Sequence, residues 1–292
     1  MKVLVTGATG NVGSYVVKEL IKINEAVVAA GTNQNKITDL FGNEVESVEL
    51  DLTNPSTYKK ALIGVDRVFL MRPPQLGKPQ DLYPFIDAMK ENNICLVSFL
   101  SLMGIENNRI PPHYKIEKYI EKVGLPYSYI RPGFFMQNLS GIHSAEIRFK
   151  DQIFIPAGKS KTSFIDASDI GFAIAMILNK PNLYQNTAFT ITGPESLDYF
   201  QVARAFSESL GRKIVYTNPS FIRYRRYYIK ERKLDKKLID ITVALYFMTR
   251  MGTAQEVTDD FQKLTGREPR TIKEFITDNI SFFIPKGASA CD

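Results

Sequence analysis

The sequence has little of what builds metal centres or disulfide frameworks. Its 292 residues include two histidines and two cysteines, Cys95 and Cys291. So few ligands argue against a structural zinc site, and two cysteines do not form a disulfide framework. No stretch is long and apolar enough to span a bilayer, and no secretory leader is recognisable. We therefore expect a cytoplasmic protein with no metal and no membrane contact.

Excess positive charge is confined to one segment. The net charge is +6, and residues 221–237 alone hold eight basic and two acidic residues, so the remainder is balanced. Arginines alternate with tyrosines there, which can indicate nucleic acid, but such a run is more often a solvated helix face. We rank a solvated face first, a cleft rim or protein-partner contact between Arg223 and Lys237 second, and nucleic acid last.

A glycine-rich turn directly follows the first apolar segment. Residues 1–6 are mostly apolar, Gly7, Gly10 and Gly13 are spaced by three, and an amphipathic segment comes next. In a dinucleotide-binding fold these glycines allow a tight turn, close approach of the pyrophosphate and close packing of helix on strand. The helix N-terminus then faces the phosphates. An ordinary strand-turn-helix connection is the alternative.

Apolar and amphipathic segments alternate through the first half of the chain. We expect strands at 2–6, 26–30, 45–49, 66–71, 95–100 and 127–131. We expect helices at 12–23, 34–41, 55–62, 80–92 and 112–123. Such alternation implies parallel strands joined by helical crossovers, so the predicted fold class is α/β with a doubly wound parallel sheet.

The pattern changes after Gly133. Residues 134–160 are predicted to be loop-like, 167–179 a helix, 188–193 another sheet strand and 197–210 a helix, while 219–251 and 253–283 are predicted to be largely helical. The first domain then comprises 1–133 plus 161–193 and binds the dinucleotide. A smaller, mostly helical substrate-binding lobe comprises 134–160 plus 194–292.

Two later strand ends bear on the choice of dinucleotide. After the second strand there is neither an acid to repel a phosphate nor an arginine to bind one; Thr32 can donate to a phosphate or a hydroxyl, and Lys36 offers a point charge. This favours NADP, with NAD as the alternative. After the third strand, Asp51 can accept from the adenine amino group, although aspartate is also common in turns.

Several segments together resemble the NmrA-like group of atypical short-chain dehydrogenase/reductases. They are the glycine turn, Asp51-Leu52, 69–71, 101–104, 124–133, 164–170 and 192–195. The resemblance covers nearly the whole chain. It implies a Rossmann domain that binds NAD(P) and a reductase that passes hydride from NAD(P)H to a quinone or a similar conjugated or carbonyl acceptor. The group also contains sensors without turnover, so an NAD(P)-sensing regulator that acts through a protein partner is the alternative, and a sugar-nucleotide epimerase is the third.

The expected acid/base residue is displaced from the superfamily pattern. Tyr114 and Lys118 have the Tyr-x-x-x-Lys spacing, but in the register that the resemblance implies the Lys position falls on His113 and the Tyr position on Arg109. His113 is then a catalytic acid, a contact to the nicotinamide ribose, or a helix cap. Ser101 is expected to steady the substrate carbonyl, unless it only satisfies a backbone group.

The resemblance also implies the lining of the site, in a protein that is a monomer or a homodimer with a small-molecule substrate. The substrate pocket is expected from Met71, Phe134, Phe135, Met136 and Asn138, although the two phenylalanines can equally be core. Cofactor contacts are expected from Gly7, Thr9, Gly10, Asn11, Val12, Gly13, Thr32, Lys36, Asp51, Leu52, Met71, Arg72, His113, Pro132, Gly133, Phe134 and Phe135.

Overall fold

The computed structural model describes residues 1–73 and 75–285, which form two compact units. The first unit comprises Met1–Pro132, Ala167–Ile191 and Asp260–Arg267. The second comprises Gly133–Asp166, Thr192–Asp259 and, as far as it is described, the chain from Glu268 onward. The boundaries differ from those expected from the sequence. Residues 133, 161–166 and 192–193 belong to the second unit, and residues 260–267 belong to the first. Cys291, which was expected to take no part in a disulfide, lies outside the described residues.

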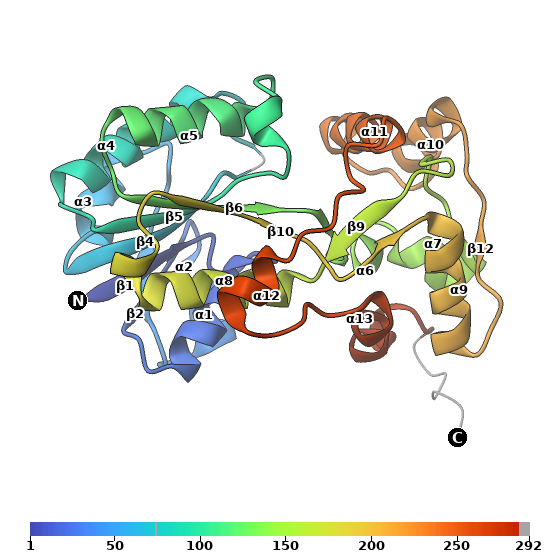
Figure 1. The fold of residues 1–292 in the computed structure, drawn as a ribbon, viewed down its shortest axis with the longest axis horizontal. Coiled ribbons are helices and arrows are strands. Elements are labelled where there is room, and N and C mark those ends of the chain that lie inside the picture. The colour runs from blue at the N-terminus through green and yellow to red at the C-terminus, as the bar shows by residue number, and fades with distance from the viewer. Residues whose placement is uncertain (74, 286–292) are drawn as a thin grey trace. The chain divides into compact units, whose positions relative to one another are not determined.

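A seven-stranded sheet with all strands parallel forms the centre of the first unit (Figure 1). Its order is β10-β6-β5-β4-β1-β2-β3, so the chain winds outward in both directions from β1 and β4, as in a Rossmann fold. The predicted α/β doubly wound class is confirmed. The strands are β1 (Lys2–Thr6), β2 (Val27–Gly31), β3 (Glu46–Glu49), β4 (Val65–Met71), β5 (Leu96–Leu100), β6 (Tyr127–Pro132) and β10 (Thr187–Ile191).

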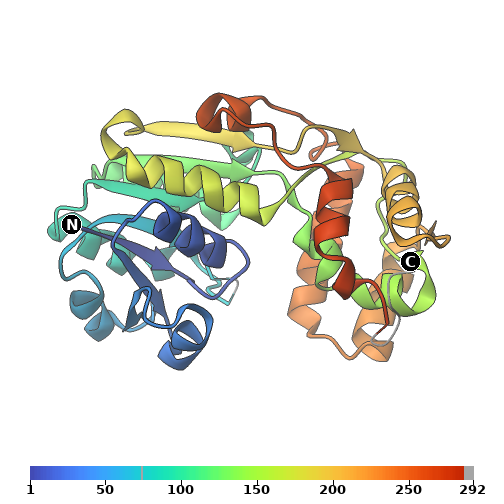
Figure 2. The ribbon, with the colours of Figure 1, turned by 90° about the horizontal axis from the view of Figure 1, so that it is seen from below.

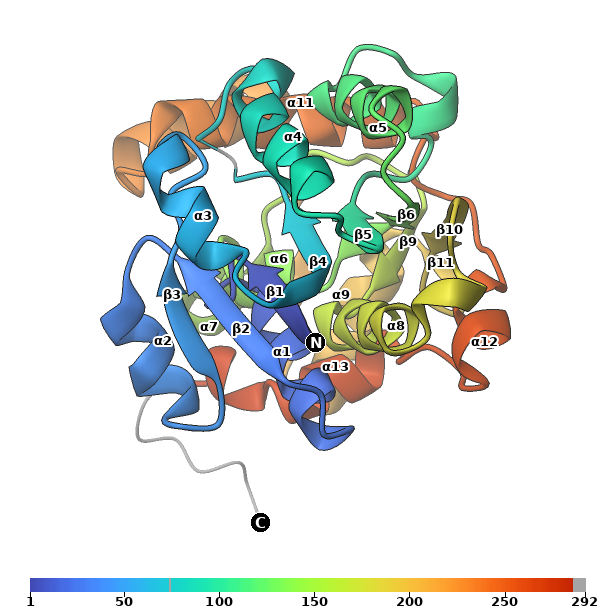
Figure 3. The same ribbon diagram turned by 90° about the vertical axis from the view of Figure 1, so that its left-hand side faces the viewer.

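Helices cover both faces of this sheet (Figure 3). One face carries α3 (Tyr58–Ala61), α4 (Tyr83–Glu91) and α5 (Pro112–Lys122), and the other carries α1 (Gly13–Lys22) and α8 (Ala167–Asn179). Near the remaining strands lie α2 (Gln34–Phe41), beside β2 and β3, and α12 (Asp260–Thr265), beside α8 and β10. Coverage on both faces explains why the strands read as continuous apolar runs.

Close packing of α1 on α8 depends on one glycine (Figure 2). A Cβ built on Gly171 would lie 2.5 Å from the Cβ of Tyr15 and 2.9 Å from its backbone carbonyl carbon. Real Cβ contacts are never that short, so only glycine allows these two helices to approach in this way. Asp260, at the start of α12, accepts a hydrogen bond of 2.8 Å from the backbone N–H of Thr190 and so ties α12 to the edge strand.

The second unit has its own hydrophobic core and two small sheets. In one sheet β9 (Thr162–Ile165) lies between β7 (Phe134–Phe135) and β11 (Ser196–Leu197), and in the other β8 (Gln152–Ile153) pairs with β12 (Val215–Tyr216). Tyr227–Glu231 forms a π-helix directly after α10. The α-helices are α6 (Gln137–Ser140), α7 (Ser144–Lys150), α9 (Tyr199–Leu210), α10 (Phe221–Arg226), α11 (Lys236–Arg250) and α13 (Ile272–Asp278).

Two expectations about local structure in this part of the chain are wrong. Residues 134–160, expected to be loop-like, contain β7, α6, α7 and β8, whose helices of four and seven residues are too short to show a clear apolar period. Residues 253–283 are helical only in α12, α13 and a 3₁₀ turn at Ile280–Phe282. Within the described chain, no helix has both the length and the apolar character needed to cross a bilayer.

Candidate functional site

Five of the parallel strands end at one edge of the sheet in segments that the sequence singled out. The glycine turn follows β1, Thr32 follows β2, Asp51 follows β3, Arg72 follows β4 and Ser101 follows β5. Because all seven strands are parallel, these segments share the carboxyl edge. The winding reverses between β1 and β4, and ligands of open α/β sheets bind at such a reversal. The sheet therefore brings the predicted cofactor and catalytic residues of the first unit to its ligand-binding edge.

The glycine turn has the geometry that a pyrophosphate site requires. Gly7 has φ +60°, and a Cβ on Gly13 would lie 2.2 Å from the carbonyl oxygen of Gly7. No side chain caps α1 at Val12, and a helix N-terminus without such a cap can bind an anion. The side chain of Met71 packs on the turn, since a Cβ on Gly7 would lie 3.0 Å from both its Cγ and its Sδ.

The segment after β2 is open at the positions expected to meet the adenosine ribose. Asn33 caps α2 by accepting from the backbone N–H of Lys36 at 3.2 Å, which leaves the lysine ammonium exposed. Thr32 is exposed as well. Both side chains are therefore accessible to a 2′-hydroxyl or a 2′-phosphate, and neither a carboxylate nor a guanidinium stands in this segment.

One carboxylate oxygen of Asp51 is hydrogen-bonded within its own turn. This oxygen accepts from the backbone N–H of Thr53 at 2.8 Å and from its hydroxyl at 2.7 Å. These hydrogen bonds hold the pKa of Asp51 below its usual value. The neighbouring Leu52 is buried, and its carbonyl accepts from the Tyr58 hydroxyl at 2.7 Å. An ionised Asp51 with a second oxygen remains suited to accept from an amino group.

His113 is an uncharged imidazole at neutral pH. It is the second residue of α5, its ring stacks on Phe99 at 5.9 Å, and its Nδ1 is buried with no hydrogen-bond partner among the described residues. Burial, together with the nearby Arg72 cation, lowers the pKa of His113 to about 4. The side chain can therefore donate or accept a hydrogen bond at pH 7 but holds no extra proton to give away.

Arg72 and Ser101 also present unsatisfied polar atoms. Arg72 donates through Nη2 to the carbonyl of Leu76, while its Nε is buried and finds no partner within the described chain. Burial lowers the pKa of Arg72. The hydroxyl of Ser101 is buried and unpartnered in the same sense, although its backbone N–H is bound to Ile130 at 2.7 Å. Buried polar atoms are normally satisfied, and a ligand could supply the partners that these three atoms lack among the described residues.

Tyr114 and Lys118 lie on a different side of α5 from its buried face. The helix buries Ile116, Glu117 and Ile120, whereas Lys118 is exposed and ion-pairs with Glu121 at 2.7 Å. The Lys118 ammonium also lies 5.9 Å from the centre of the Tyr114 ring. These partners are those of a helix surface, in keeping with the register that assigns the active position to His113.

The remaining pocket candidates belong to the second unit, apart from Met71. Phe134 is partly exposed and packs edge-on against Phe164 at 6.1 Å, with Tyr246 at 5.7 Å. Met136 is 1% exposed in the core, and Phe135 and Asn138 are half-buried. Phe134 thus joins an aromatic cluster and still offers part of its ring. The structure adds no test of the roles predicted for these residues, or for Pro132 and Gly133.

A buried polar network surrounds His143, and no pattern in the sequence predicted it. This histidine has no exposed surface, and its two ring nitrogens lie 2.8 Å from the hydroxyl of Tyr228 and 2.6 Å from that of Tyr246. Glu146, one helical turn later, accepts from the hydroxyls of Tyr227 and Tyr228 at 2.8 and 2.9 Å and ion-pairs with Arg232. The partners lie more than 80 residues apart in sequence, so no local spacing reveals them.

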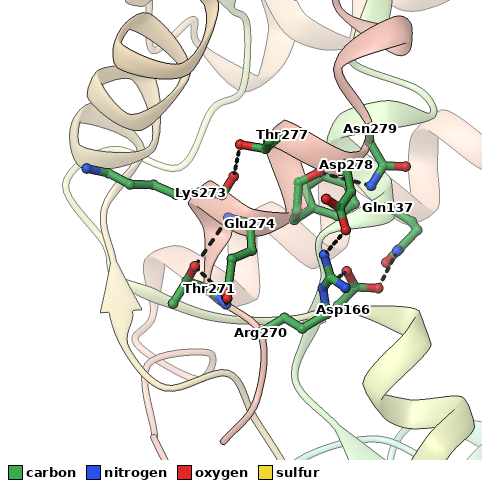
Figure 4. A network of polar contacts seen from close by, with 10 residues as sticks. Gln137, Asp166, Arg270, Thr271, Lys273, Glu274, Thr277, Asp278 and Asn279 are labelled. Carbon is green, nitrogen blue, oxygen red and sulfur yellow. Dashed lines mark hydrogen bonds and ion pairs between the residues drawn. The ribbon is translucent and has the colours of Figure 1, made fainter.

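A second polar network joins Asp166 to the start of α13 (Figure 4). Asp166 is buried, accepts from the amide of Gln137 at 2.9 Å and pairs with Arg270 at 3.3 Å. Arg270 also pairs with Asp278. These contacts hold segments of the second unit together. Across residues 1–73 and 75–285, no group of three or more His, Cys, Asp and Glu side chains is placed to hold a metal ion.

Comparisons with known proteins agree with this architecture. A model of the NmrA-like family matches residues 1–276. The chain is 30% identical over 287 residues to an NAD(P)H azoreductase of Xenophilus azovorans, covering 96% of this chain and 99% of that protein. It is 29% identical over 286 residues to prestalk A differentiation protein A of Dictyostelium discoideum, covering 96% and 93%. The NADPH-dependent quinone oxidoreductase QOR2 of Escherichia coli, solved with NADPH, superposes with a TM-score of 0.86 over 95% of this chain and 99% of that one, at 21% identity.

Proposed function

Because this chain belongs to the NmrA-like family, we propose that it is an NAD(P)H-dependent oxidoreductase that reduces a quinone, an azo dye or a similar flat conjugated or carbonyl acceptor. The glycine turn and the relatives named as an azoreductase and a quinone oxidoreductase support the cofactor and the class of acceptor. The observation that carries the proposal is the set of unsatisfied buried atoms of Arg72, Ser101 and His113 at the ligand-binding edge of the sheet.

In this proposal the first unit binds the dinucleotide along its carboxyl edge. The turn from Gly7 to Gly13 and the N-terminus of α1 hold the pyrophosphate, and Asp51 accepts from the adenine. Thr32 and Lys36 face the ribose, and without a carboxylate to repel a phosphate they favour NADPH over NADH. NADPH or NADH, when bound, supplies the hydride, and the protein supplies orientation and a dry environment.

His113 then acts as a hydrogen-bonding group and not as a stored acid. With its pKa lowered to about 4, it is uncharged at pH 7 and can donate to the acceptor oxygen or to the nicotinamide ribose. A quinone needs no strong protein acid, because its oxyanion is already stabilised by conjugation. This chemistry is compatible with a chain whose Tyr114 and Lys118 lie on a helix surface.

The direct test is oxidation of NADPH and of NADH, followed by the absorbance of the reduced nicotinamide, with quinones, azo dyes and triarylmethane dyes as acceptors. We expect acceptor-dependent oxidation that is faster with NADPH. Replacing His113 by Phe should reduce the rate, while the matched neighbour variant Tyr114→Phe should leave it unchanged. Loss of activity in Tyr114→Phe with none in His113→Phe would overturn the register.

A nucleotide-responsive regulator is the second candidate. It draws support from the relative that is named for differentiation and not for a reaction, and from the basic segment between Arg223 and Lys237. Such a protein would bind NADPH or NADP tightly and oxidise nothing across the acceptor panel. Saturable cofactor binding without turnover would therefore favour the regulator over the reductase.

A further inference from the structure

The basic segment at 221–237 separates into paired and unpaired side chains. Arg225 pairs with Asp240 through a bond of 2.6 Å from Nε to Oδ1, and Arg232 pairs with the buried Glu146. Arg223 and Arg226, which flank Arg225 on α10, have no ion-pair partner among the described residues and are exposed. Of the three arginines of α10, Arg225 is thus neutralised, and Arg223 and Arg226 keep their charges free.

The two unpaired arginines line one pocket together with Lys150, the last residue of α7. The pocket has a volume of about 490 Å³, and Glu231 is the carboxylate in its lining. Gln152 adds an amide, and Thr217 and Tyr227 add hydroxyls. Three cations against one anion leave two positive charges uncompensated in a concave site.

Two aromatic rings line this pocket and contact two of its cations. Lys150 donates to the hydroxyl of Tyr227 at 2.9 Å, and its ammonium lies 4.6 Å from the centre of that ring. The guanidinium of Arg223 lies 5.7 Å from the ring of Phe154. Both rings are nearly buried, at 8% and 5% exposure. Cations held over rings keep their charge available while losing conformational freedom, which lowers the entropy cost of binding an anion.

The π-helix orients the wall of the pocket. Its wide turn buries Tyr227 and Tyr228 side by side, and both hydroxyls donate to Glu146. Glu146 accepts from these two tyrosines and ion-pairs with Arg232, so the Glu146–Arg232 pair adds no net charge beside the pocket. π-Helical turns are rare and occur frequently at functional sites.

We propose that this pocket binds a phosphate monoester group. A phosphate monoester carries between about 1.5 and 2 negative charges at pH 7, which matches the two uncompensated positive charges. Arginine guanidinium groups bind phosphate oxygens through paired N–H donors, and the lysine adds a point charge. The group belongs either to a free small molecule or to a phosphorylated side chain of a partner. The assignment stands independently of the reductase activity, because all its residues lie in the second unit.

The test is calorimetric titration of the full chain with inorganic phosphate and phenyl phosphate at constant ionic strength. We expect saturable binding in wild type that weakens roughly tenfold in Arg226→Gln and in Arg223→Gln. Arg225→Gln is the matched control, since it removes the same charge from the same helix but a side chain paired with Asp240, and its affinity should equal that of wild type. NADPH affinity should be unchanged in all three variants, which separates this result from the reductase assay.

A phosphoserine peptide and its unphosphorylated form distinguish the two sources of the group. Tighter binding of the phosphopeptide than of inorganic phosphate assigns the site to a modified partner, and equal or weaker binding assigns it to a small molecule. Absence of saturable binding by any phosphate probe, or equal weakening in Arg225→Gln, would overturn the proposal. The substituted side chains are exposed, and thermal unfolding of each variant verifies that it is folded.

Discussion

Each unit of the molecule contains one histidine with a buried ring nitrogen, and the surroundings of the two differ. His143 in the second unit has both ring nitrogens bonded to tyrosine hydroxyls, and the adjoining Glu146 is equally satisfied. His113 in the first unit has a buried nitrogen without a partner in the described chain, as do Arg72 and Ser101. A satisfied buried group stabilises a fold, whereas an unsatisfied one costs free energy unless a ligand satisfies it. We call the first surroundings a structural centre and, in line with the proposed function, the second a binding centre.

Removing the carboxylate of Glu146 from the structural centre should have the largest effect on stability. In Glu146→Ala two buried tyrosine hydroxyls lose their acceptor and Arg232 loses its partner, so we expect the free energy of unfolding to fall by about 3 kcal/mol. Denaturant titration measures this. Asp240→Asn, which breaks an exposed pair, is the control and should show no measurable change. Equal effects of the two substitutions would refute the distinction.

Removing His143, whose two ring nitrogens are both hydrogen-bonded, should lower stability and leave the catalytic rate unchanged. His143→Phe removes a hydrogen-bond partner from the hydroxyl of Tyr246 and one of two partners from that of Tyr228, which still donates to Glu146. We expect this to cost about 2 kcal/mol of unfolding free energy. At a temperature where the variant is folded, its kcat with NADPH and a quinone should match that of wild type. A variant of full stability with lost activity would place His143 in the binding centre instead.

Removing His113, which has a ring nitrogen without a partner among the described residues, should lower activity and leave stability unchanged or higher. His113→Phe deletes the hydrogen-bonding group that we propose contacts the acceptor or the nicotinamide ribose, so we expect kcat/KM to fall roughly tenfold, equivalent to about 1.4 kcal/mol. Its unfolding free energy should be unchanged or higher, because an unpaired buried nitrogen is replaced by carbon. Urea titration and steady-state kinetics on the same preparations compare the two quantities. Destabilisation comparable to that in His143→Phe would show that His113 is structural.

Lowering the pH should reveal a smaller effect of His143 on stability. Burial and the Arg232 cation lower the pKa of His143 to about 3, while its ordinary value is 6.5. Between these values the unfolded chain binds the extra proton, so stability falls as the pH drops below 6.5 and is constant above it. We expect His143 to contribute about 1 kcal/mol of this loss between pH 6.5 and 5.5. The loss should be smaller in His143→Phe, measured by thermal unfolding across that range; an identical pH dependence would contradict the assignment.

What the sequence predicts well is local. The glycine turn, the strand ends and the alternation of strands and helices extend over a few residues each, and the structure confirms the α/β doubly wound sheet that they predict. Each of these features has a spacing that side-chain chemistry can interpret. The register that assigns the active position to His113 and not to Tyr114 comes from the family resemblance and stays a prediction.

What the sequence hides depends on distant pairing. His143 meets Tyr246 across 103 positions, and Asp166 meets Arg270 from an equally separate part of the chain. The eight basic residues at 221–237 look uniform until their partners are known, because Asp240 and Glu146 neutralise two of them and leave Arg223 and Arg226 free. The helices of 134–160 escape notice because four to seven residues are too few to show an apolar period.

The chain passes between its two units five times, after residues 132, 166, 191, 259 and 267. During synthesis the ribosome therefore delivers seven strands of the first unit long before α12, which binds the N–H of Thr190 through Asp260. Until α12 has been synthesised, the edge strand β10 is incompletely covered, and most of the second unit is made in that interval. Such an exposed edge invites pairing with another nascent chain. Expression yield and the choice of truncation points should thus depend on Asp260–Arg267, a short segment far from the cofactor turn in sequence.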